Sequence, residues 1–338
     1  MDTFLNIYSF IGSISLYAFK YFNIFFKSDK IKNLLELIQY DWDSLKEKEE
    51  LKIMHKRGNT GIHFTFVLII LIYAMTFLCG LTLFWPTIFD IIIPLNESRQ
   101  SWNSSKTMEY FINQKNYIYL LFVYLVLINF IGATILITID SFAIMCIQHA
   151  CAMFQITSYR IECIVNKRQI KSLAISKKSD TYKNIAKVID IHLRAIKFVD
   201  TMKSIYEIIH LILIPIGVTV FSINLFRFCE YLVADTKDFG IIITFWFVIS
   251  NICYLFINNY IGQQIIDHSN NVFKKICSIR WYATSLYTQK CLLMMMQRSM
   301  KSSTLSVASV FLPSLEGFAT LINTSLSYCM VIYSRRQS

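Results

Sequence analysis

The last apolar segment of the chain, residues 311–334, carries more polar side chains than a helix in hydrocarbon usually does. Steps of helical spacing from Glu316 follow one stripe of residues, which are Thr320, Asn323, Ser327, Val331 and Arg335. Polar groups inside a membrane are costly and usually face a cavity, a partner helix or a water path. The stripe is therefore a candidate pore lining, with Val331 as an aliphatic ring that gates by dewetting.

A second interpretation of the stripe stays open, because Asn323 and Ser327 are also suited to hydrogen bonding with a neighbouring helix. One such helix cannot enclose a channel. The pore interpretation therefore requires several subunits around an axis.

Enzyme chemistry has no comparable signal in this sequence. There is no HExxH, P-loop, GxGxxG or GxSxG motif, and the six histidines do not pair at metal-ligand spacing. The nine cysteines form no CxxC pair. We predict no catalytic residue, no metal site and no cofactor.

Composition places the chain in a membrane. Of its 338 residues 55% are hydrophobic and 16% are charged, and the mean hydropathy is +0.47. Soluble domains have roughly 45 to 50% apolar and about 25% charged residues. The excess apolar surface must face lipid, so we predict an all-α polytopic membrane protein.

Six segments are long and apolar enough to cross about 30 Å of hydrocarbon as helices. They are residues 1–26, 62–85, 117–139, 208–228, 239–262 and 311–334. The short apolar piece 291–297 is too short to cross and is predicted to be a cytoplasmic or re-entrant helix.

Basic residues set the predicted orientation. The connecting segments 27–61, 140–207 and 263–310 hold 25 of the 33 Lys and Arg residues, which marks them as cytoplasmic. Segments 86–116 and 229–238 then lie outside. The first of these contains two N-glycosylation sequons, at Asn96 and Asn103. The net charge of +11 reflects this loop pattern and does not indicate nucleic-acid binding.

Two cytoplasmic stretches have amphipathic helical patterns, residues 27–58 and 183–207. The first is expected to pack on other helices or, alternatively, to lie on the membrane surface. The second should extend the span at 208, and its apolar stripe is either an oligomer contact or part of an intramolecular bundle. His149, and Arg160 with Glu162, are expected to form hydrogen bonds at the cytoplasmic membrane edge.

Several stretches are similar to one known family. They are Asp41-Trp42 with the Glu-rich helix up to Gly61, Pro94-Leu95-Asn96-Glu97-Ser98, Gln148-His149-Ala150-Cys151 through Tyr159-Arg160-Ile161-Glu162, and a tail from Trp281-Tyr282 through Met296-Gln297-Arg298-Ser299 to Ser325-Leu326-Ser327-Tyr328, Val331 and Ser334. On these residues the chain resembles the insect odorant receptors over essentially its whole length.

The resemblance implies seven helices with a cytoplasmic N-terminus, inverted relative to G-protein-coupled receptors. Six predicted spans place both ends outside. The span at 1–26 resembles the second family helix, so we expect the sequence to be a fragment that lacks the first helix.

The resemblance also implies a multi-pass receptor in the plasma membrane of olfactory neuron dendrites, surrounded by lipid. Such a receptor is a ligand-gated, non-selective cation channel, a hetero-tetramer of odorant-binding subunits and the co-receptor Orco. Its last helix lines the pore, with Val331 at the gate, and its cytoplasmic extensions form the anchor domain where subunits meet. Volatile ligands would bind an apolar pocket in the outer half of the membrane, for which depth nominates Phe10, Tyr73, Thr76, Phe77, Leu125, Asn129, Phe221 and Phe245.

Other membrane proteins fit less well. A gustatory receptor of the same superfamily usually has a Thr-Tyr start and a Gln-Phe end in its tail, whereas here Ser327-Tyr328 has no such end. A G-protein-coupled receptor has the opposite orientation. A transporter should show matched repeats or broken helices, which the sequence lacks.

Overall fold

Long helices make up a computed structural model of the chain, which describes residues 15, 17–92, 116–170, 178–233, 239–308 and 310–337. Residues 17–26 are helical and lead into the first labelled helix. The elements are α2 (Ser28–Ser44), α3 (Lys48–Ile92), α5 (Asn116–Ile170), α6 (Lys178–Val233), α7 (Phe239–Ser278), the 3₁₀ turn η1 (Trp281–Ala283), α8 (Leu286–Ser299) and α9 (Leu315–Gln337).

Five of the helices are long and apolar enough to cross a membrane, counted over the residues that the structure describes. They contain five of the six predicted spans, and most of the remaining one, residues 1–26, falls outside the described residues. The all-α polytopic class is confirmed. Several spans continue into segments predicted as cytoplasmic: α5 has 55 residues and α6 has 56, far more than the roughly 20 that cross a bilayer.

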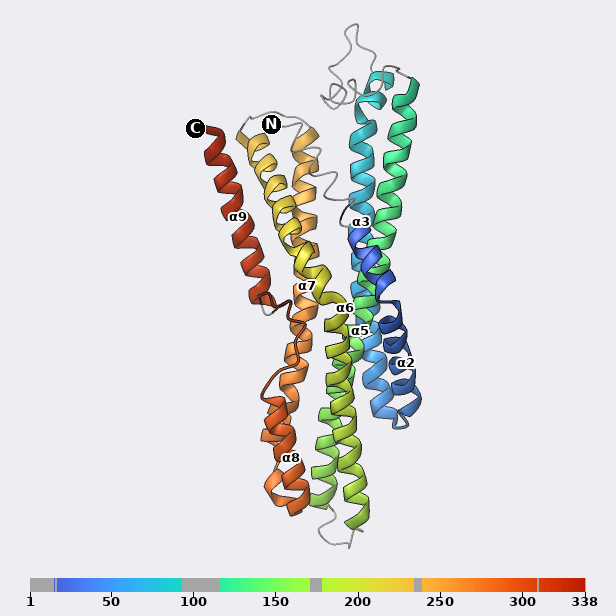
Figure 1. Ribbon diagram of the computed structural model, residues 1–338, viewed down its shortest axis with the longest axis vertical. Helices are drawn as coiled ribbons and strands as arrows, with labels where there is room; N and C mark the ends of the chain where they lie inside the picture. The colour runs from blue at the N-terminus through green and yellow to red at the C-terminus, as the bar shows by residue number, and fades with distance from the viewer. Residues whose placement is uncertain are drawn as a thin grey trace.

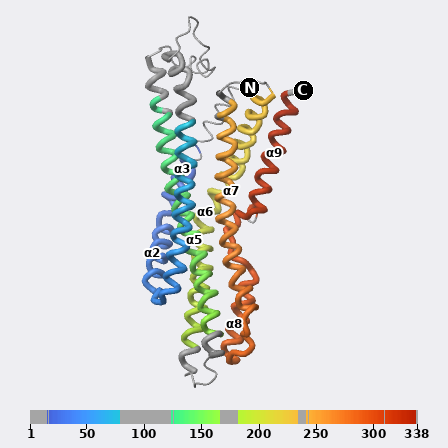
Figure 2. The backbone as a smooth tube through the Cα atoms, turned by 180° about the vertical axis from the view of Figure 1, so that it is seen from behind, coloured from blue at the N-terminus to red at the C-terminus, as the bar shows by residue number. Residues whose placement is uncertain are grey.

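The helices form one elongated bundle (Figures 1 and 2). At one end α3 and α5 run together, and α6, α7 and α9 form a second group. At the other end α8 packs along α7. The predicted extension of the span at 208 is confirmed, because α6 is continuous from Lys178.

The tightest packing lies in the part of the bundle predicted to be cytoplasmic. Side chains from α5, α6 and α7 fill it, among them Phe154, Phe198, Met202, Ile265 and Val272, all 2% exposed or less. The apolar stripe of 183–207 is buried in this core, so the intramolecular bundle is the correct alternative for that stripe.

The amphipathic stretch 27–58 is two helices and not one, which corrects the prediction. The helix α2 ends at Ser44, and Leu45 is extended with φ −82° and ψ 122°. The chain then turns back so that both apolar faces reach the same core, with the Trp42 and His55 rings 5.1 Å apart. The face of α2 around Leu34 packs on other helices, as expected.

Pro215 lies inside α6, where a proline ring removes one backbone hydrogen bond and favours a kink. The hydroxyl of Thr219 donates to the Pro215 carbonyl at 2.7 Å. Pro215 is therefore a place at which a bend in α6 is favoured.

Candidate functional site

The helix α9 starts from a turn that is fixed against α7. The Ser314 hydroxyl caps the helix by accepting the backbone N–H of Gly317 at 3.0 Å. From α7, the Asn259 side-chain oxygen accepts the Ser314 N–H at 3.3 Å, and that of Gln263 accepts the Leu315 N–H at 3.4 Å. Three N–H groups that a helix start leaves unpaired are thus satisfied, and two of them anchor α9 to its neighbour.

A close backbone approach completes this anchor. A Cβ atom added at Gly262 of α7 would lie 2.5 Å from the Pro313 carbonyl oxygen. Only glycine leaves room for the turn at this place. The position of the start of α9 is therefore fixed in two ways. The Ser314 cap lies on the α9 side, and Gly262, which has no side chain, lies on the α7 side.

Two sets of residues on α9 differ in burial. Residues at steps of four are buried against the rest of the chain: Gly317, Leu321, Ser325 and Cys329. The residues of the predicted stripe are exposed at every position: Glu316, Thr320, Asn323, Ser327, Val331 and Arg335. The polar face of the helix thus points away from its own subunit.

Hydroxyl groups of the stripe are paired within the helix. Thr320 donates to the Glu316 carbonyl at 2.9 Å, and Ser327 donates to the Asn323 carbonyl at the same distance. Such bonds satisfy the hydroxyl hydrogen in a membrane and leave the oxygen lone pairs facing outward. For Ser327 the partner is its own helix and not a neighbouring one.

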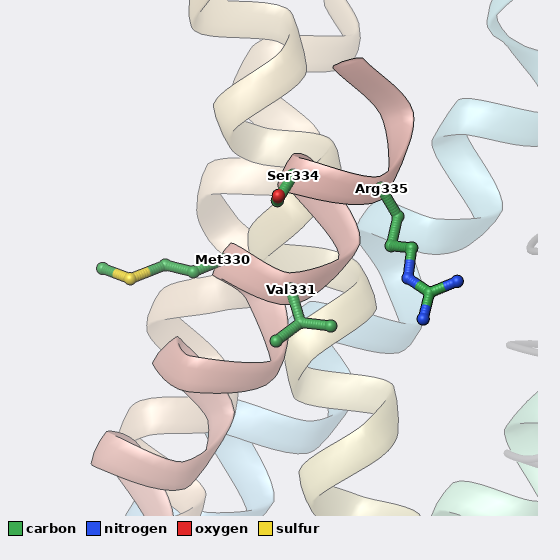
Figure 3. A pocket seen from close by; sticks show the side chains of 4 residues that line it. All are labelled: Met330, Val331, Ser334 and Arg335. Atoms are coloured by element: carbon green, nitrogen blue, oxygen red, sulfur yellow. The ribbon is translucent and has the colours of Figure 1, made fainter. Parts of the chain in front are cut away.

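An open hollow lies beside the C-terminal part of α9 and has a volume of about 380 Å³. Figure 3 shows its four lining residues, with Met330, Val331 and Arg335 extending from successive sides of the helix and Ser334 one turn above. Val331 is 57% exposed and Met330 is 69% exposed. The predicted gate residue thus lies on the open side of α9, where no other part of the described chain covers it.

The residues nominated for a ligand pocket lie on two separate seams. Between α3 and α5, the Tyr73 hydroxyl lies 3.2 Å from the Thr134 hydroxyl, and the Tyr73 ring stacks on Phe130 at 5.5 Å. Between α6 and α7, the Phe245 ring lies 5.9 Å from that of Phe228.

The other nominees differ in their burial and contacts. Thr76 bonds to its own helix, Asn129 is half-buried, Phe77 is 66% exposed and Phe221 is 2% exposed. Phe10, the Leu125 side chain and the sequons at Asn96 and Asn103 lie outside the described residues. The pocket nominations remain predictions.

A buried triad of polar side chains joins three helical segments, and it was not predicted from the sequence. The Lys20 ammonium donates to Asp140 of α5 at 2.6 Å and to the Tyr254 hydroxyl of α7 at 2.9 Å. Tyr254 in turn donates to the other Asp140 oxygen at 2.7 Å. The sequence did contain a signal for this triad. Lys20 lies inside one apolar segment and Asp140 directly follows another, and charged side chains in such places need partners.

Ion pairs also connect α2 and α3 to the core. His149 and Arg194 both contact the Asp41 carboxylate, at 3.0 and 2.5 Å. Arg160 binds Glu50 through two nitrogens.

Arg160 and Glu162 both form polar contacts, as expected, but with different partners, because Glu162 pairs with Lys275 of α7 at 2.7 Å. Side chains of opposite charge that are two residues apart on a helix do not face each other. His149 is a buried hydrogen-bonding group, but its partner comes from α2.

Comparison with solved structures identifies the arrangement of these helices. The fold is similar to the insect olfactory receptor OR5 from Machilis hrabei, with a TM-score of 0.66 and 13% identity over 97% of this chain and 80% of that one. The same receptor in complex with eugenol gives a TM-score of 0.65 and 12% identity, over 98% and 81% of the two chains. At these identities the likeness concerns the fold.

Sequence comparison gives the family. No curated protein matches the chain. The model of the 7tm odorant receptor family matches residues 1–326, which is nearly the whole length. With its helices long and apolar enough to span a membrane and its exposed last helix, the chain belongs to the 7tm odorant receptor family.

Proposed function

We propose that this odorant receptor is the ligand-binding subunit of a ligand-gated, non-selective cation channel, in a hetero-tetramer with the co-receptor Orco. The two-faced helix α9 is the observation that carries the proposal: one face is packed on its own subunit and the polar stripe is left uncovered. Several such helices around an axis would turn their stripes toward a shared water path. The site of action would be the plasma membrane of an olfactory neuron dendrite.

Val331 is the proposed gate. In a ring of subunits its exposed isopropyl group would form the one aliphatic level in an otherwise polar lining. A narrow aliphatic ring expels water and stops ions, and a wider one fills. Thr320, Asn323 and Ser327 would support hydrated cations on the side of the gate toward the start of α9.

Small volatile molecules are the proposed ligands. The OR5 structure solved with eugenol supports this ligand class. The pocket would lie among the outer parts of the helices, where burial contributes about 0.8 kcal/mol per methylene. A ligand that binds the open state better than the closed one shifts the population toward open channels.

Patch-clamp recording in cells that co-express the chain with Orco tests the proposal, with a panel of volatiles applied from outside. Val331→Ala should raise the resting current, because two methyl groups fewer in each copy of the chain weaken the aliphatic ring. Leu326→Ala is the matched control, since Leu326 is also an exposed aliphatic residue of α9 but lies off the stripe.

Evoked cation current without G-protein signalling supports the receptor-channel function. A G-protein-dependent response contradicts it. If Val331→Ala leaves the resting and evoked currents of a responding channel unchanged, the gate assignment is wrong.

A further inference from the structure

The helices α6 and α9 run side by side toward their C-terminal ends (Figure 1), and two side-chain contacts join them there. Arg336 forms an ion pair with Glu230, and its guanidinium carbon lies 5.8 Å from the centre of the Phe226 ring. The thiols of Cys229 and Cys329 are in hydrogen-bonding contact with each other.

Helical spacing places both contacts on one seam. Phe226, Cys229 and Glu230 are three and four residues apart and share one face of α6. Cys329 and Arg336 are seven residues, about two turns, apart and share one face of α9. The ion pair thus helps to hold the two helices in the register at which the thiols meet.

An oxidant reaches the pair through Cys229. Cys329 is 7% exposed, whereas Cys229 is half-buried and gives a small oxidant access. The C-terminal ends of α6 and α9 lie on the side that the loop charges predict to be extracellular, where disulfides form and persist. Two thiols in contact need little movement to become bonded.

We propose that Cys229 and Cys329 are a peroxide-sensitive modification site, at which oxidation to a disulfide fastens α9 to α6. Two thiols and one hydrogen peroxide give one disulfide and two waters. The two S–H bonds and the O–O bond break, one S–S bond and two O–H bonds form as the thiol protons pass to the peroxide oxygens, and the two electrons reduce the peroxide. Exchange with an external dithiol reverses the step.

The effect on current rests on the proposed function of α9 as the pore helix. Opening requires the Val331 level to widen, so α9 must move relative to its neighbours. A covalent bond at Cys329, two residues before Val331, opposes that movement. Oxidation should therefore lower the evoked current.

The test uses the full chain co-expressed with Orco and exposed to hydrogen peroxide. Free thiols are then alkylated, and the purified chain is digested with trypsin. Cleavage after Lys and Arg leaves each cysteine of the pair as the only one on its peptide, at 228–237 and 302–335. We expect a linked species of the summed masses less two hydrogens, which dithiothreitol separates. The evoked current should fall with peroxide and recover with dithiothreitol.

Serine variants provide the controls. Cys229→Ser and Cys329→Ser should each lose the linked peptide and the peroxide effect on current. Cys277→Ser should keep both, because Cys277 is an exposed thiol outside the seam. Orco expressed alone gives the response of the partner subunit, which is subtracted.

A wild-type chain that yields no linked peptide under peroxide overturns the modification site. A linked peptide with an unchanged current overturns its effect on the channel. If no volatile evokes current but the linked peptide forms, the modification site is supported while the proposed channel function is not.

Discussion

The buried triad of Lys20, Asp140 and Tyr254 gives a sharp prediction about stability. The Lys20 and Asp140 side chains are each 10% exposed, and the pair connects helical residues 17–26 to α5. Asp140→Asn keeps the shape and the hydrogen bond with Tyr254 but removes the negative charge. The Lys20 ammonium is then left buried without a counter-charge.

Removing one partner of a buried ion pair costs roughly 3 to 5 kcal/mol. That is a large part of the about 5 to 15 kcal/mol by which folded proteins are stable. Lys20→Met should be destabilising for the same reason, since it leaves Asp140 unpaired. The double variant Lys20→Met/Asp140→Asn removes both charges and should recover most of the loss.

Thermal melting of the detergent-solubilised full chain, followed by fluorescence-detected gel filtration, measures the effect. Lys52→Met is the control, because the Lys52 side chain is 75% exposed and lies 3.9 Å from Glu49. Such exposed pairs contribute about 0 to 1 kcal/mol. The reasoning fails if Asp140→Asn has the same melting temperature as the wild type. It also fails if the double variant loses as much stability as the two single variants lose together.

Substitutions at three further positions test the placement of α9 and α3. Gly262→Ala should push the start of α9 away from α7, because the added Cβ would meet the Pro313 carbonyl oxygen at 2.5 Å. We expect a loss of about 1 to 3 kcal/mol of stability in a melting experiment and a lower evoked current. Unchanged melting and current would show that the turn has room for the methyl group. Ser314→Ala removes the cap of α9 and should cost about 0.5 to 2 kcal/mol in the same experiment, whereas Ser314→Asp should retain most of the stability. Glu50→Gln breaks the bidentate ion pair with Arg160 and should lower the free energy of unfolding by roughly 3 to 5 kcal/mol. A loss below about 1 kcal/mol would mean that Arg160 finds another partner.

Periodic patterns in the sequence predicted the local structure well. Apolar runs located five helices that are long and apolar enough to span a membrane, and the step from Glu316 to Arg335 identified the exposed face of α9. Both depend on residues close together in the chain. The break at Leu45 was missed because the helical pattern continues on both sides of it.

Periodic patterns do not predict contacts between residues that are far apart in the sequence. Arg160 was expected to form hydrogen bonds, but its partner, Glu50, is 110 residues away and was not predicted. Lys20 and Asp140, 120 residues apart, are a similar case. The ligand-pocket nominations used only depth in the membrane, and depth does not say which helices meet.

The long continuous helices can transmit a tilt from one end of the receptor to the other. Because α5 rises about 1.5 Å per residue, its 55 residues extend for about 80 Å, from its N-terminal end into the buried core. A tilt of about 3° at a pivot in that core displaces a tip about 40 Å away by about 2 Å, which is comparable to the helix shifts of allosteric transitions. In α6, Pro215 favours a bend that can absorb part of such a tilt, whereas α5 is one continuous helix. A small tilt of α5 in the core therefore displaces its far end with no local change there.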